Sequence, residues 1–120
     1  MQKEFTMVAD FHQKFTQPDV PIPATALANL SAFWYSLISG EVDEYKRACK
    51  SDDIPGVAKE LADVLYAVYG TILEHGLCNK MDAVFAEVHR SNMSKEYHEY
   101  KMIKGSNHTE PNLRGIIKTG

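Results

Sequence analysis

Four acidic side chains stand in two pairs that share one spacing along the chain: Glu41 with Glu44, and Glu60 with Asp63. If these segments are helical, a spacing of three residues puts both carboxylates of a pair on one face, one turn apart. The two pairs also lie symmetrically about residue 52, which is the middle of a short break between two helical patterns. In an antiparallel helix pair with that register, Glu41 faces Asp63. Glu44 then faces Glu60, so the sequence predicts four carboxylates at one level of a helix bundle.

Four like charges in a partly buried site need compensation: either some carboxyl groups stay protonated or a cation lies among them. Ligation by oxygen alone suits hard cations such as Mg²⁺, with Mn²⁺ as a substitute, and does not suit zinc. The small residues Gly56, Ala67 and Gly70 of the second segment leave room for a ligand or for another helix. The alternative is an exposed acidic seam that binds nothing, because Glu-x-x-Glu on a helix is commonly a solvated face.

Two helical patterns must position these carboxylates. The first runs over residues 24–50 and has a core-facing stripe in alternating steps of three and four residues: Leu27, Leu30, Trp34, Leu37, Glu41, Glu44 and Ala48. The second begins at Pro55, which suits the first turn of a helix, with Asp52 or Asp53 as its N-cap. It ends near Gly76, which suits the left-handed conformation of a C-terminal cap. Because the break between them is short, the two helices are predicted to be antiparallel neighbours.

Two further helices are expected outside this pair. Residues 2–15 carry apolar side chains at helical spacing, and the proline-rich stretch 17–23 cannot continue that helix. The other helix is expected over about 80–98, where Asn79 and Asp82 resemble a capping arrangement.

Composition and pattern together indicate one small globular domain. The chain has 120 residues, of which 44% are hydrophobic and 24% are charged, as is usual for a folded domain. No stretch alternates for long with the period of two that a half-buried strand requires. We therefore expect a single all-α domain over 1–120, an antiparallel bundle of four to five helices with an irregular tail over 105–120. A chain this short has little core of its own, so we also expect a homo-oligomer.

Charge and hydropathy argue against several other functions. A net charge of −3 argues against nucleic-acid binding as the main task. The longest uncharged apolar stretch, 24–39, is interrupted by polar residues and falls short of the roughly 20 residues that cross a bilayer. The first residues show no signal-peptide pattern, and Cys49 and Cys78 have no CxxC or zinc spacing. We expect a cytoplasmic protein that binds neither nucleic acid nor a membrane.

The acidic motif resembles the signature of a known superfamily. Glu-x-x-Glu at 41–44, followed after about fifteen residues by Glu-x-x-Asp at 60–63, is similar to the signature of the MazG-like all-α nucleoside triphosphate pyrophosphohydrolases. Residues 86–95 and 104–107 resemble the phosphoribosyl-ATP pyrophosphohydrolase-like branch of that superfamily. The resemblance covers about residues 8–117.

This resemblance implies an all-α fold and Mg²⁺-dependent hydrolysis between the α- and β-phosphates of a nucleoside triphosphate, which yields a nucleoside monophosphate and pyrophosphate. It assigns the metal-ligand and catalytic positions to the four carboxylates of the motif: Glu41, Glu44, Glu60 and Asp63. One of them could also act as general base on the attacking water. The chain departs from the pattern at Gly40, where many relatives carry another Glu. That departure bears on the number of metal ions and on the choice of base.

The resemblance also implies where the substrate is held. The positions that contact phosphates are occupied by Asn92, Lys95, Arg90 and Lys104. Phe15 and His12 would contact the nucleobase. The other interpretation of the basic residues is structural, because cations near a helix C-terminus favour the helix dipole. Arg90 could equally pair with Glu87, three residues earlier.

Two alternatives to this function remain open at this point. The substrate could be phosphoribosyl-ATP instead of an ordinary nucleoside triphosphate. The chain could also be a non-catalytic helical module that binds metal or nucleotide, although such a module would be expected to lose a carboxylate and here all four are present. The resemblance suggests a homodimer or a dimer of dimers, with sites near the subunit contacts.

Overall fold

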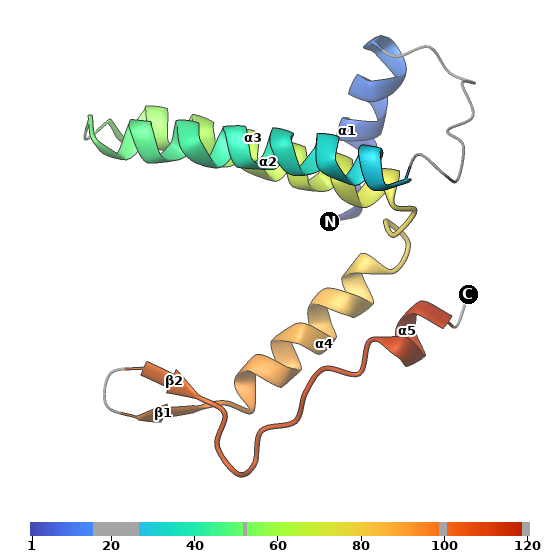
Figure 1. The fold of residues 1–120 in the computed structure, drawn as a ribbon, viewed down its shortest axis with the longest axis vertical. Coiled ribbons are helices and arrows are strands. Elements are labelled where there is room, and N and C mark those ends of the chain that lie inside the picture. The colour runs from blue at the N-terminus through green and yellow to red at the C-terminus, as the bar shows by residue number, and fades with distance from the viewer. Residues whose placement is uncertain (16–26, 52, 99–100, 119–120) are drawn as a thin grey trace. The chain divides into compact units, whose positions relative to one another are not determined.

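The computed structural model describes residues 1–15, 27–51, 53–98 and 101–118 (Figure 1). Within these ranges the regular elements are α1 (Gln2–Phe15), α2 (Leu27–Cys49), α3 (Ile54–Glu74), α4 (Met81–Met93), β1 (Glu96–His98), β2 (Lys101–Ile103) and α5 (Arg114–Lys118). The chain forms two compact units, one over Gln2–Gly76 and the other over Leu77–Gly120 together with Met1. The dominance of helix confirms the expected all-α class in outline. The single domain and the oligomer stay predictions.

The unit over Gln2–Gly76 contains the predicted helix pair. α2 and α3 lie side by side and run in opposite directions after a short turn (Figure 1). Asp53 is the N-cap of α3, with an extended backbone at φ −106° and ψ 101°, and Pro55 lies in the first turn as predicted. Gly76 adopts a positive φ of 70° after the last turn, which is the conformation expected of a glycine that ends a helix. The predicted start of α2 at 24–26, the proline-rich stretch 17–23 and the alternative cap Asp52 lie outside the described residues.

A small apolar core joins α1 to this pair. Phe5 and Val8 of α1 and Trp34 of α2 are buried. The ring of Phe5 meets Tyr69 of α3 edge to face, with 5.0 Å between the ring centroids, a favourable geometry for an aromatic pair. Gly70 of α3 lets the Trp34 ring lie close to the α3 backbone, because a Cβ at position 70 would be only 2.9 Å from Cζ3 of Trp34. The core therefore depends on one large indole ring that lies against one residue without a side chain.

The second unit differs from the prediction of one long helix over 80–98. α4 begins at Met81 with Lys80, not Asn79, as its N-cap, and it ends at Met93. The chain then forms an antiparallel hairpin of β1 and β2 in which Tyr97 pairs with Met102. Strands of three residues are too short to show a period-two pattern. α5 is a second difference, since no helix was predicted in the tail.

The tail between β2 and α5 is irregular, as expected, but it is tied to the end of α4. The Thr109 amide donates to Ser94 Oγ at 3.1 Å, and the same hydroxyl lies 2.8 Å from Nδ1 of the buried His108 ring. Ser91 Oγ donates to the Thr109 carbonyl at 2.9 Å, and Arg90 donates to Thr109 Oγ1 at 2.6 Å. Ser94 Oγ also bonds to the Ser91 carbonyl of its own helix, and a serine hydroxyl that bonds to neighbouring backbone competes with helix formation, which favours the end of α4 here.

We expect Ser94→Ala to loosen this attachment. It removes the acceptor of the Thr109 amide and the partner of His108, and such losses cost about 1–3 kcal/mol when the remaining groups stay buried. Hydrogen exchange at the Thr109 amide should become at least about tenfold faster, as an opening free energy lower by about 1.4 kcal/mol requires. The matched control is Ser106→Ala, since Ser106 is exposed in the same segment. Unchanged protection of Thr109 would contradict the assignment.

No helix in the described part of the chain has the length and apolar character that a membrane crossing requires.

Candidate metal centre

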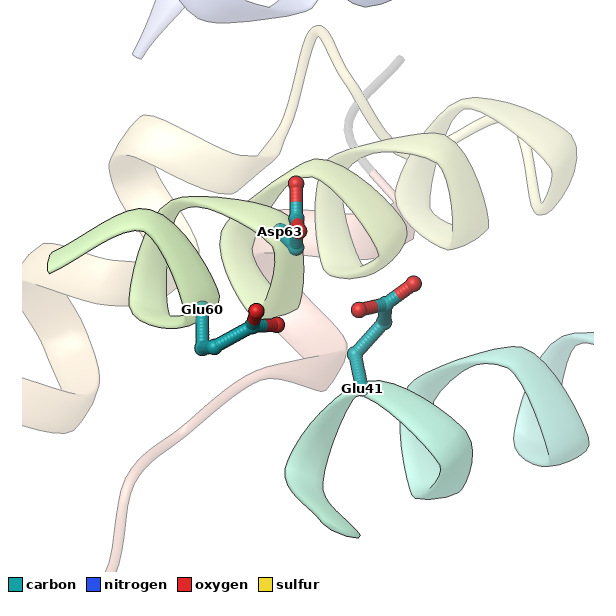
Figure 2. A group of neighbouring side chains, drawn as sticks. All are labelled: Glu41, Glu60 and Asp63. Atoms are coloured by element: carbon teal, nitrogen blue, oxygen red, sulfur yellow. The ribbon is translucent and has the colours of Figure 1, made fainter. Parts of the chain in front are cut away.

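Three of the predicted carboxylates meet between α2 and α3. Glu41 of α2 and Glu60 and Asp63 of α3 each offer one oxygen, and these oxygens all lie within 4.8 Å of one another (Figure 2). All three residues are half-buried. We call this group the carboxylate cluster. It contains three of the four carboxylates that the spacing of the motif predicted to converge from two neighbouring helices.

The register of the helix pair explains why these residues meet. Trp34 lies two turns before Glu41 on α2, and Gly70 lies two turns after Asp63 on α3. Residues seven apart share a helix face, so an antiparallel register that places Trp34 against Gly70 also places Glu41 against Asp63. Trp34 does lie close to Gly70 in the core, so the helix pair has this register. Glu60 joins the cluster because it lies one turn before Asp63 on the same face.

The fourth carboxylate, Glu44, does not join the cluster, contrary to the predicted convergence of four. Its side chain forms an ion pair and a hydrogen bond with Arg47 on the same helix. Both side chains are more than half exposed, at 51% and 63%. The hydrogen bond to Glu44 is the main reason why the pKa of the Arg47 guanidinium is raised. Pairing with Arg47 keeps a fourth negative charge away from three that already repel one another.

A lysine beside the cluster was missed by the sequence prediction. Lys59 Nζ lies 2.7 Å from Asp63 Oδ2 and 3.5 Å from Glu60 Oε1. The hydrogen bond to Asp63, and then the negative charges of Asp63 and Glu60, raise the pKa of the Lys59 ammonium. The signal was present in the sequence, because Lys59 stands four residues before Asp63, a spacing at which helical side chains meet.

The donor set fits a hard divalent cation. Carboxylate oxygens are the ligands that Mg²⁺ and Mn²⁺ prefer, and the cluster contains no His or Cys that would favour zinc. Around Mg²⁺ at about 2.1 Å, octahedral ligand oxygens are separated by about 3–4.2 Å. The observed separations, up to 4.8 Å, require only a small inward movement of half-buried side chains. The residues present therefore suit one such ion.

The residues predicted to contact phosphates lie in the second unit. Asn92 is exposed near the end of α4, and Lys95 is half-buried just after it. Arg90 Nε donates to Glu87 at 2.7 Å, and this bond is the main reason why the pKa of the Glu87 carboxyl is lowered. Lys104 Nζ donates to Glu110 at 2.7 Å and likewise lowers the pKa of that carboxyl. The expected pair of Arg90 with Glu87 is thus present, and the phosphate-binding role of all four basic or amide residues stays a prediction.

The two residues predicted to contact a nucleobase lie on α1. His12 is half-buried, with its ring centroid 5.6 Å from that of Trp34. Phe15 is 67% exposed, and its ring lies 5.1 Å from that of Phe11. His12 therefore contributes to packing around Trp34, whereas the Phe15 ring is mostly exposed, with the Lys14 ammonium 5.2 Å from its centroid. Their contact with a base stays a prediction.

Comparison with known proteins places this geometry in a family. The family model for phosphoribosyl-ATP pyrophosphohydrolase matches residues 8–92, well over half of the chain, and includes the whole carboxylate cluster. No curated protein matches the chain. The family implies a pyrophosphohydrolase, a hydrolase of acid anhydrides, and such enzymes generally use divalent metals. The chain belongs to the phosphoribosyl-ATP pyrophosphohydrolase family, within the superfamily of MazG-like all-α nucleoside triphosphate pyrophosphohydrolases.

Proposed function

We propose that this protein hydrolyses nucleoside triphosphates between the α- and β-phosphates, with Mg²⁺ or Mn²⁺ as cofactor, to a nucleoside monophosphate and pyrophosphate. The observation that carries the proposal is the carboxylate cluster: three hard oxygen ligands from two helices within 4.8 Å, in a chain of this family. A triphosphate carries up to about four negative charges and would be repelled by such a cluster without a bridging cation.

In this proposal Glu41, Glu60 and Asp63 hold the metal, which neutralises phosphate charge and lowers the pKa of a bound water. Their half-buried position strengthens electrostatic interactions relative to open solvent. Glu44 stays a candidate ligand or base, and it must leave Arg47 to serve as either. The reaction also calls for basic side chains that stabilise the pyrophosphate leaving group. Of the basic residues predicted to contact phosphates we favour Lys95, because Arg90 and Lys104 already hold ion pairs.

Phosphoribosyl-ATP is the second candidate substrate, because the matching family model is named for it. Its hydrolysis breaks the same kind of bond, between the α- and β-phosphates, and would use the same carboxylates. The two candidates differ in the group attached to the base and not in the bond that is broken, so the carboxylate cluster gives no reason to prefer either. A direct comparison of substrates is therefore the way to choose between them.

We also propose that the active form is a homodimer or a dimer of dimers. Within the described residues the buried apolar core is small, while many large apolar side chains of α2 and α3 are exposed, among them Phe33, Leu37, Val42, Leu61, Leu65 and Tyr66. Apolar faces of this kind commonly mark an interface between protein chains. Sedimentation equilibrium over a range of concentrations would measure the assembly directly.

The reaction can be tested by ³¹P NMR on the purified protein with separate NTPs, dNTPs and phosphoribosyl-ATP, each with Mg²⁺ and with EDTA. We expect monophosphate and pyrophosphate signals only in the presence of the metal. Fastest turnover of phosphoribosyl-ATP would support the second candidate. Diphosphate and orthophosphate as products would show that another bond is cleaved and would contradict the proposal. A lack of turnover on every substrate would favour a non-catalytic module.

A further inference from the structure

The ion pair between Lys59 and Asp63 has the less favourable of the two possible orders along a helix. The spacing is i to i+4, and the lysine precedes the acid. The Lys59 side chain is also 69% exposed, so burial does not force it into this position. What distinguishes Asp63 is its surroundings, because its carboxylate lies beside those of Glu41 and Glu60. Repulsion among three negative charges makes this a place where any cation is favoured.

Lys59 meets two of the three cluster members. Its ammonium lies 2.7 Å from Asp63 and 3.5 Å from Glu60. Only 17% of the Glu60 side chain and 36% of the Asp63 side chain are exposed, so these carboxylates are less well solvated than the lysine that neutralises them. The ammonium thus supplies one of the positive charges that the carboxylate cluster needs.

We propose that Lys59 is a built-in competitor of the metal, whose ammonium must leave Asp63 and Glu60 before a divalent cation is fully bound. The proposal rests on the metal site under the proposed function. A dication held by the same carboxylate would lie close to the ammonium, and like charges at short separation repel. Lys59 can move away at low cost, because its long side chain is mostly exposed to solvent. Lys59 therefore lowers the metal affinity of the carboxylate cluster and compensates its charge when no metal is bound.

The test measures binding of Mn²⁺ alone, without nucleotide, from the electron paramagnetic resonance signal of the free ion. We expect Lys59→Met to bind Mn²⁺ about three- to fivefold more tightly than the unmodified protein, as loss of one exposed ion pair worth up to about 1 kcal/mol allows. Lys59→Arg keeps the charge and should stay within about twofold. Because the effect is electrostatic, the gain in Lys59→Met should shrink as KCl is raised from about 0.05 to about 1 M.

The matched control is Lys46→Met, which removes the same charge from an exposed position on the partner helix. Its Mn²⁺ affinity should change less than twofold. Lys59→Gln is a second variant, which removes the charge but keeps a polar side chain. Its Mn²⁺ affinity should match that of Lys59→Met, because the effect comes from the lost charge and not from packing of the new side chain. Circular dichroism without metal checks that each variant keeps its helices.

The possible outcomes separate this inference from the proposed function. If the unmodified protein binds Mn²⁺, and Asp63→Asn abolishes that binding, the metal site stands. Equal or weaker binding by Lys59→Met would then overturn the competition alone, and weaker binding would show that Lys59 assists the metal. If neither the unmodified protein nor Lys59→Met binds Mn²⁺, both the metal site and the competition are overturned.

Discussion

Replacing Glu60 with Gln should lower kcat/KM for the hydrolysed nucleotide by at least about 100-fold. The substitution keeps the size of the side chain but removes a negative charge and one of the three ligand oxygens that lie within 4.8 Å. An amide oxygen binds Mg²⁺ more weakly than a carboxylate does, so Mn²⁺ binding should weaken together with the rate. The measurement is steady-state release of pyrophosphate at several Mg²⁺ concentrations, with the direct Mn²⁺ titration beside it.

The control for this prediction is Glu74→Gln on the same helix. Glu74 is exposed at the end of α3 and lies outside the carboxylate cluster. The rate and metal affinity of Glu74→Gln should therefore stay within about twofold of those of the unmodified protein. If a folded Glu60→Gln variant kept the activity of the unmodified protein, Glu60 would not be a metal ligand. A rate loss without any loss of metal binding would instead assign Glu60 to the handling of the attacking water.

Gly70→Ala should lower the free energy of unfolding by up to about 2 kcal/mol, although alanine is the better helix former by about 1 kcal/mol. The added Cβ would lie 2.9 Å from Cζ3 of Trp34 and 3.0 Å from Cε1 of His12. Trp34 is buried, with 8% of the residue exposed, so its rigid ring has little space into which it can move. Overpacking of this kind costs about 1–3 kcal/mol, which exceeds the gain in helix propensity. Urea denaturation followed by circular dichroism measures the change.

Gly40→Ala provides a matched comparison of opposite sign. Gly40 also lies inside a helix, but a Cβ there would meet nothing within 4 Å. The helix propensity should then act alone and stabilise the protein by up to about 1 kcal/mol. A stabilising effect of both substitutions would contradict the close contact between Trp34 and Gly70. It would also remove the packing evidence for the register that places Glu41 against Asp63.

The second unit shows how far local pattern extends. The helical pattern predicts a helix where α4 lies, at Met81–Met93, but it extends that helix to residue 98. The structure instead has strand β1 of the hairpin at Glu96–His98. The end of α4 depends on Ser94, whose hydroxyl bonds to Thr109 and His108, more than ten residues further along the chain. A partner at that distance leaves no periodic signal, so the pattern alone could not place the end of the helix.

The sequence by itself determined the two long helices, the short turn between them and the level at which Glu41 meets Asp63. These features depend on the spacing of residues within one or two helical turns and on the shortness of the turn, which are both properties of neighbouring residues. The resemblance to the family also rested on linear motifs, and the family model confirms it over 8–92.

Only the tertiary structure decided which other charged side chains join the carboxylate cluster and which stay out of it. Glu44 had two possible partners, the carboxylate cluster or Arg47, and it is found with Arg47. Lys59 is found with Asp63, because the neighbouring carboxylates make that position favourable for a cation. Exposed ion pairs differ from one another by only about 1 kcal/mol or less. Both ion pairs lie within one helix, so the spacing of their residues allows them. Whether each pair forms in preference to another contact also depends on the distances to side chains of the neighbouring helix, which residue types and spacing do not specify.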